Sequence, residues 1–191
     1  MKGVYIFLAE GFEDMEAIGT RDVLVRGGVD VKTVSLDGKR EVTSSHGTTV
    51  RADMVRSEFD TQPGRELADR KDVLIFPGGM PGSKFLAGDR PLMELMKRHY
   101  VLGGTVAAIC AAPGLVASQL SPLSGIRFTC FDGFERYMTE KGAVYTPEST
   151  VVDGHLITGR GAGHAIAFGL AILAYLEGEE AAAKVRAGLM L

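Results

Sequence analysis

Apolar and polar positions along this chain switch repeatedly between the period of a strand and the period of a helix. The continuous apolar run Gly3–Ala9 has the length of a strand that is buried on both faces. Glu13–Arg26 then has helical spacing and ends at a Gly-Gly pair, and Val29–Leu36 alternates as a second strand does. This strand–helix–strand opening favours a parallel sheet with right-handed crossovers.

The same alternation continues to the end of the chain. Further strands are expected at Asp72–Phe76, Thr105–Ile109, Thr150–Val152 and Leu156–Thr158. Further helices are expected at Pro91–Tyr100, Ala111–Leu120, Phe134–Gly142, Ala165–Leu176 and Glu179–Gly188. The last two strands are expected to form a hairpin, and the polar segment Asp37–Arg56 a small hairpin outside the main sheet. We therefore expect one α/β domain over residues 1–191, a doubly wound sandwich with a mostly parallel central sheet and helices on both faces.

Composition and charge indicate which partners and which cellular compartment to expect. The net charge of −3 leaves no basic patch, so we expect no nucleic-acid partner. The longest helical apolar stretch, Ala165–Leu176, is shorter than the about 20 residues that span a bilayer, so we expect no membrane insertion. The N-terminal apolar run is expected to be the first strand and no signal peptide, and two cysteines form no disulfide framework, which favours the cytoplasm.

Four segments with unusual residues follow strands of the predicted sheet. They are Glu10–Glu16, Pro77–Gly82 (PGGMPG), Cys110 and Gly159–His164 (GRGAGH). Because open α/β sheets bind ligands outside the carboxyl ends of their strands, we expect these segments to build the functional site.

Cys110 is the candidate nucleophile. It stands at a strand-to-helix turn among small residues, where a side chain is exposed at the top of the sheet and faces the free N–H groups of a helix start. Such a position stabilises a thiolate. The alternative is a small buried hydrophobe, and the local pattern alone does not choose between the two.

The other segments offer partners for this thiol. Glu16 stands among apolar residues, and it is either solvated or buried beside the thiol, where its pKa would rise and its neutral form would donate to sulfur. Gly79 is the candidate backbone donor to an oxyanion, unless PGGMPG is an ordinary turn. Arg160 either binds an anion or pairs within the protein.

No cofactor or metal is expected. The loop GRGAGH resembles a nucleotide-binding loop but lacks the strand and the acidic residue that complete the dinucleotide fingerprint. No two histidines have metal-ligand spacing, and none adjoins Cys110. His99 and His155 are expected on the surface, and His164 at the start of a closing helix.

Several ordered motifs together resemble the ThiJ/PfpI (DJ-one) superfamily, in the branch of the parkinsonism-associated deglycase and its bacterial relatives. The resemblance rests on GVYIFLAEGFEDMEAIGTRDVLVRGG, DVLIFPGGMPGSKFL, VAAICAAPGLVA, LITGRGAGHAIAFGLAILAYLEG and the terminal AAAKVRAGLML. It implies a flavodoxin-like sandwich of the class I glutamine amidotransferase type, a homodimer, and activity without a cofactor.

By this resemblance Cys110 matches the reactive cysteine, and Glu16 the buried acid that is hydrogen-bonded to it. Gly79 and the Ala111 amide match the anion-binding backbone, Arg160 matches an arginine at the edge of the pocket, and Gly78 is a further residue expected in that pocket. Members with protease-like sites carry a histidine directly after the nucleophile. Ala111 occupies that position here, which argues against a cysteine peptidase.

Two positions depart from the close relatives. Cys130 stands where they place a histidine near the thiol, and His46 stands where many carry an arginine. Losing that histidine removes a proton shuttle. Cys130 is then either a resolving thiol for an oxidised Cys110 or a packed small side chain.

Two functions remain open at this point. The first is a glyoxalase-like or deglycase-like enzyme that acts on small α-oxoaldehydes or their protein adducts through Cys110 and Glu16. The second is an oxidative-stress sensor or redox-regulated chaperone, in which Cys110 is oxidised to a sulfinate. The partners implied are a small aldehyde or a glycated protein.

Overall fold

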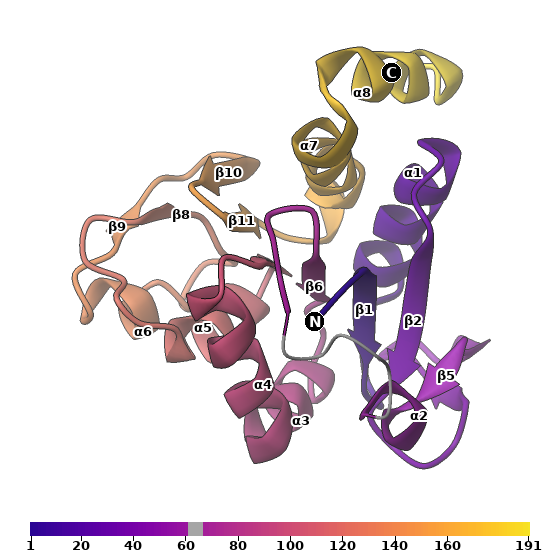
Figure 1. Cartoon of the computed structure of the whole chain (residues 1–191), viewed down its shortest axis with the longest axis horizontal. Helices are drawn as coiled ribbons and strands as arrows, with labels where there is room; N and C mark the ends of the chain where they lie inside the picture. The colour runs from indigo at the N-terminus through magenta and orange to yellow at the C-terminus, as the bar shows by residue number, and fades with distance from the viewer. Residues whose placement is uncertain (61–66) are drawn as a thin grey trace.

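A seven-stranded sheet forms the centre of the protein, seen in a computed structural model that describes residues 1–60 and 67–191 (Figure 1). Every pair of neighbouring strands in it is parallel except β10 and β11, which form the expected antiparallel hairpin. In spatial order the strands are β10 (Thr150–Asp153), β11 (Leu156–Gly159), β7 (Thr105–Ile109), β6 (Val73–Phe76), β1 (Val4–Leu8), β2 (Val31–Ser35) and β5 (Met54–Val55). The doubly wound α/β class expected from the pattern is confirmed.

Helices cover both faces of the sheet, because strands buried on both sides send alternate side chains into two separate cores. On one face Phe7 and Ala108 pack against α3 (Gly82–Gly88), α4 (Arg90–Val101) and α5 (Ala112–Leu115). On the other face Ile6 and Ile109 pack against α1 (Thr20–Arg26) and α7 (Ala165–Glu177), while α8 (Glu179–Gly188) packs on α7. Figure 1 shows the two groups of helices on opposite sides of the sheet.

The topological switch point lies between β1 and β6. From β1 the chain continues outward through β2 to β5, and from β6 it continues in the opposite direction through β7 to β11. The loops that follow β1, β6 and β7 therefore start side by side at the carboxyl edge. Open α/β sheets bind ligands in the crevice outside the strand ends at such a switch point.

Two expected helices differ from the prediction. The helix expected over Glu13–Arg26 begins as a π-helix, η1 (Met15–Gly19), and becomes α-helical only at α1. The helix expected over Ala111–Leu120 ends after one turn of α5 and continues as the 3₁₀ turn η2 (Ala117–Gln119). Gly114 lies in this turn and disfavours helix, and a side chain there would collide with Phe134.

Short elements were harder to predict. The expected small hairpin forms from β3 (Glu41–Thr43) and β4 (Thr49–Arg51), but the pattern did not indicate that β5 joins the main sheet. It also missed α3 and the parallel pair β8 (Arg127–Phe128) and β9 (Val144–Tyr145). The remaining elements are α2 (Arg56–Asp60), α6 (Arg136–Thr139) and η3 (Ala162–His164).

The surface position expected for His99 is wrong. His99 is buried, and its Nε2 lies 3.1 Å from the carbonyl oxygens of both Asp72 and Thr105. Burial lowers the pKa of His99 to about 4, so the ring is neutral and serves as a hydrogen-bonding core residue.

The most apolar helix, α7, is buried among α1, α8 and β11. No helix of the described ranges is both long enough and apolar enough to cross a membrane.

Candidate active site

Cys110 occupies a strained backbone position directly after β7. Its φ is 65°, a left-handed conformation that among the described non-glycine residues only Met190 shares. The Cys110 N–H donates to the Gly159 carbonyl at 2.9 Å, and the Cys110 carbonyl accepts from the Phe131 N–H at 2.9 Å. The chain is thus held on both sides in a conformation that lifts the sulfur out of the strand, as in a nucleophile elbow.

Two backbone N–H groups face the sulfur. They belong to Ala111, the first residue after the elbow, and to Gly79 in the loop after β6, and their hydrogen bonds to sulfur favour the thiolate. These are the two donors expected from the sequence, and the tertiary structure brings them together from adjacent loops. They would equally accept an oxyanion that forms next to the sulfur.

Glu16 is buried beside this thiol. It lies in η1 with 1% of its surface exposed, and its Oε2 accepts from the Gly78 N–H at 2.6 Å. The Glu16 N–H donates to Glu13 Oε2 at 2.8 Å, so Glu13 holds the start of the turn. Single π-turns are frequent at functional sites, and this one carries Glu16 into the switch-point crevice. The buried alternative for Glu16 is therefore correct.

Burial raises the pKa of Glu16 to about 7, although hydrogen bonds with Cys110 and Gly78 oppose the shift. Burial also raises the pKa of Cys110, and the negative charge of Glu16 raises it further. The two groups therefore titrate as one unit that loses its first proton near pH 7 and its second much higher. Between these steps the pair holds one negative charge and one proton, and a protonated Glu16 can donate to a thiolate.

Glycines are required in the loop after β6, which lies against both Glu16 and Cys110. A Cβ at Gly78 would lie 2.5 Å from Glu16 Oε2 and 2.6 Å from the Cys110 Cβ. Gly79 has a φ of +88° and packs on the backbone of Glu13 and Gly11. Only glycine lets this backbone approach the acid and the thiol so closely.

The structure places Arg160 and Cys130 at the side of this site. Arg160 Nη2 lies 3.0 Å from Asp132 Oδ1, and Nη1 donates to the Pro147 carbonyl at 3.3 Å, which is the internal pairing that the sequence left open. Cys130 is fully buried in the core on the α3–α4 face, whereas Cys110 packs on the opposite core. This arrangement favours the packed reading of Cys130.

His46 is exposed on the loop between β3 and β4. Its Nδ1 lies 2.8 Å from Asp14 Oδ2, and the hydrogen bond to Asp14 raises the pKa of His46. Although burial opposes ionisation, hydrogen bonds from Ser44 and His46 lower the pKa of Asp14 to about 2. One ligand atom each of Glu13, Asp14 and His46 lie within 4.8 Å of one another, a spacing that a metal ion also accepts. Hydrogen bonds within the protein already use the Asp14 and His46 groups.

Sequence reasoning missed the role of one residue in this geometry. Gly159, at the end of β11, supplies the carbonyl that fixes the Cys110 N–H, and a Cβ there would lie 2.8 Å from Ile109. Glu13 lies in the expected segment Glu10–Glu16, and its carboxylate accepts from the Glu16 N–H. The glycine-rich loop GRGAGH was expected at the functional edge of the sheet, and its glycines were the available signal for Gly159, whose carbonyl supports the Cys110 backbone.

Comparison with known proteins agrees with this geometry. Residues 2–175 match the DJ-1/PfpI family. Protein DJ-1 homolog B of Arabidopsis thaliana is 34% identical over the whole chain, which spans 42% of that longer protein. Glutathione-independent glyoxalase DJR-1.2 of Caenorhabditis elegans is 33% identical over 90% of the chain and 86% of its own length. The crystal structure of Drosophila melanogaster DJ-1beta superposes with a TM-score of 0.87 at 31% identity, covering 100% of this chain and 98% of that one. The chain belongs to the DJ-1/PfpI family.

Proposed function

We propose that this protein is a cofactor-independent enzyme that converts small α-oxoaldehydes, of which methylglyoxal is the simplest common example, into α-hydroxy acids. The observation that carries the proposal is the buried Glu16 carboxyl, which is held against Cys110 at a pKa of about 7. An acid–base group with a pKa near neutrality is suited to move protons next to a nucleophile. The relative named a glutathione-independent glyoxalase supports the same chemistry.

The first step is addition of the thiolate to the aldehyde. The Cys110 sulfur forms a bond to the aldehyde carbon, and the electron pair of the carbonyl bond moves to oxygen. The Ala111 and Gly79 N–H groups, which already face the sulfur, stabilise that oxyanion. The protonated Glu16 gives its proton to that oxyanion, which yields a hemithioacetal and leaves Glu16 as the carboxylate that acts in the next step.

The second step is an isomerisation without net gain or loss of protons. Glu16 takes the proton from the former aldehyde carbon and returns a proton to the neighbouring ketone carbon, while the hydroxyl proton passes between the two oxygens. The product is a thioester of the hydroxy acid. Water then cleaves the carbon–sulfur bond, which releases the acid and restores the thiol. Aldehyde adducts of protein side chains can enter the same sequence once the aldehyde is released.

The test is lactate formation from methylglyoxal without glutathione or any added cofactor. Cys110→Ala and Glu16→Gln are each expected to lower kcat/KM at least about 1000-fold, since each removes a group that acts in bond formation. Cys130→Ala is the matched control and should keep the rate within about threefold, since it leaves the nucleophile and its acid unchanged. Full turnover in Cys110→Ala, or an equal loss in Cys130→Ala, would contradict the proposal.

A second candidate function, a sensor of peroxide, is favoured by one further observation. Glu16 Oε1 is buried and makes no hydrogen bond within the described part of the chain. Oxidation of the Cys110 thiolate by two molecules of peroxide gives a sulfinate and two waters, and a protonated Glu16 would donate to a sulfinate oxygen. Intact-mass measurement should show two added oxygens on Cys110 in the wild type, and this gain should be lost in Glu16→Ala. Equal oxidation of Cys130 would contradict a selective site.

The homodimer expected from the resemblance also remains a proposal. Met15 and Ile18 expose apolar surface on η1, next to Glu16 in the sequence, and a second copy of the chain would cover such surface. Sedimentation equilibrium should give twice the chain mass for the wild type and a weaker association for Ile18→Glu. A monomeric wild type at micromolar concentration would contradict it.

A further inference from the structure

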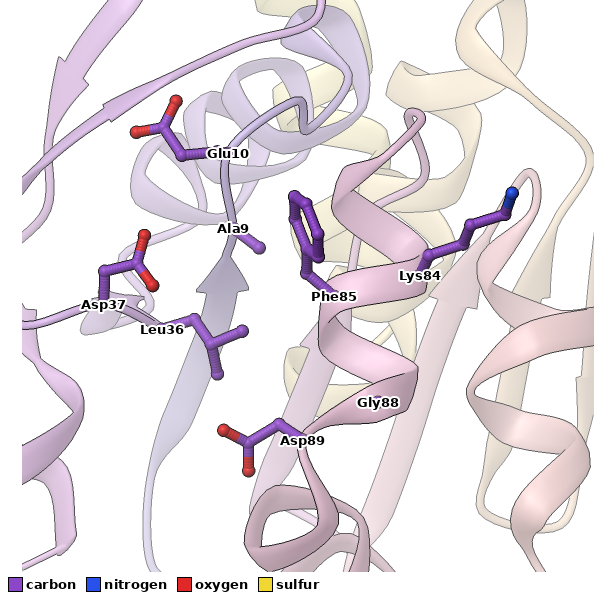
Figure 2. A pocket seen from close by; sticks show the side chains of 8 residues that line it. All are labelled: Ala9, Glu10, Leu36, Asp37, Lys84, Phe85, Gly88 and Asp89. Carbon is purple, nitrogen blue, oxygen red and sulfur yellow. The ribbon is translucent and has the colours of Figure 1, made fainter.

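A cavity opens at the carboxyl edge of the sheet, on the face that carries α3. It has a volume of about 670 Å³ and lies where β1 and β2 end. Its lining, shown in Figure 2, consists of Ala9, Glu10, Leu36, Asp37, Lys84, Phe85, Gly88 and Asp89. None of the residues that hold the Cys110 thiol lines it, so this cavity is separate from the site described above.

The walls of this cavity differ in chemistry. Ala9, Leu36 and the Phe85 ring supply apolar surface, and Phe85 is 49% exposed although its ring is large and apolar. The carboxylates of Glu10 and Asp37 lie across the cavity from the Phe85 ring (Figure 2). A volume of this size is typical of sites for small organic molecules.

The charges at the rim favour a cation. Three of the lining side chains are carboxylates and one is an ammonium, and the Lys84 side chain points away from the three acids in Figure 2. The Asp37 carboxylate has no hydrogen bond or ion pair with the described residues. Both oxygens of Glu10 lie 3.3 Å from a single donor, the Thr43 N–H.

Asp89 contributes less to this rim. Its Oδ1 accepts from the Leu92 N–H at 2.7 Å and lies 3.1 Å from Arg56 Nη1. The charge of Asp89 is therefore already used at the start of α4. Asp37 and Glu10 are the groups left to recognise a ligand.

We propose that this cavity binds a small organic cation with an apolar stem, an alkylamine or an alkylguanidinium. The cationic head would lie between Asp37 and Glu10, and the stem would lie along Leu36 and the face of the Phe85 ring, which also attracts a cation. This binding is independent of the proposed oxoaldehyde chemistry, because the two sites share no lining residue.

Agmatine is the probe, because it joins an ammonium and a guanidinium by a four-carbon stem. Isothermal titration calorimetry at low ionic strength should show saturable binding to the wild type and none of the neutral 1,4-butanediol. Added salt should weaken the binding. Asp37→Asn is expected to weaken it about fivefold, as for one partly exposed ion pair.

Asp30→Asn is the matched control. It removes the same charge from an exposed aspartate just before β2, where Asp30 pairs with Lys32 at 2.8 Å and lines no part of the cavity. Asp30→Asn and Cys110→Ala should both bind agmatine as the wild type does, while Phe85→Leu should bind it more weakly. Equal binding of butanediol, equal losses in Asp30→Asn and Asp37→Asn, or no saturation in the wild type would overturn the proposal.

Discussion

Cys110 and Cys130 lie in adjacent segments of the fold, yet the protein surrounds them differently. The Phe131 N–H bonds the Cys110 carbonyl at 2.9 Å, so the backbones touch, and burial raises the pKa of both thiols. Only Cys110 has the left-handed backbone, the two facing amides and the buried carboxyl. Cys130 has no exposed surface and packs among apolar side chains. The comparison indicates that burial alone makes a thiol inert, while a fixed set of donors and one acid make a half-buried thiol reactive.

The largest expected difference between the two thiols is their rate of alkylation. Iodoacetamide at pH 8 should modify Cys110 about 1000-fold faster than Cys130, because Cys130 reacts only when the core opens locally. Peptide mass spectrometry over a time course measures both rates in one sample. Equal alkylation rates would show that the elbow does not make Cys110 more reactive than Cys130.

Glu16, the acid beside Cys110, should make the free energy of unfolding depend on pH. The pKa of Glu16 is raised from 4.5 to about 7 in the folded protein, so the stability that it contributes is full below about pH 4.5 and is lost as the pH rises to about 7. The shift corresponds to about 3 kcal/mol. The free energy of unfolding of the wild type relative to Glu16→Gln should fall by about this amount between those two pH values.

Urea denaturation at several pH values measures this difference. Cys130→Ala is the control, and its difference from the wild type should stay constant over the same range. A flat difference for Glu16→Gln would mean that Glu16 titrates at an ordinary pKa and is not tuned by burial.

The Gly78→Ala variant tests the contact between Glu16 and the Cys110 thiol. In Gly78→Ala the new methyl group would collide with both Glu16 and Cys110, so we expect alkylation of Cys110 to slow about 100-fold, a loss typical of misplaced reacting groups. Gly38→Ala is the matched control, because a Cβ there meets nothing within 4 Å. Cys130 should react unchanged in both variants.

The smallest expected effect concerns stability, and it tests the backbone strain at position 110 separately from the reactivity of the thiol. The Cys110→Gly variant should be about 1 kcal/mol more stable to unfolding than Cys110→Ala, because the φ of 65° strains any residue that has a Cβ. At position 130 we expect the opposite order, since alanine there fills core volume and loses less entropy. Thermal or urea unfolding of the four variants measures the two differences. The same sign at both positions would contradict the strain argument.

The sequence by itself determined the sheet and the position of the tight turn at Cys110. Continuous apolar runs such as Gly3–Ala9 and Thr105–Ile109 became buried strands, because a strand with apolar side chains on both faces is stable where both faces of the sheet are covered. Small residues around Cys110 allowed a tight turn, and this local requirement is visible in the chain. The fold class and the segments at the carboxyl edge could therefore be predicted.

Only the tertiary structure decided which polar groups are buried and what they face. Glu16 is buried because a π-turn and the Gly78 N–H, 62 residues away in sequence, meet at the switch point. His99 is buried because two distant carbonyls bond to its ring, and Cys130 faces a different core from Cys110. Such outcomes depend on contacts between separate segments, whose energies a local pattern of apolar and polar residues does not contain.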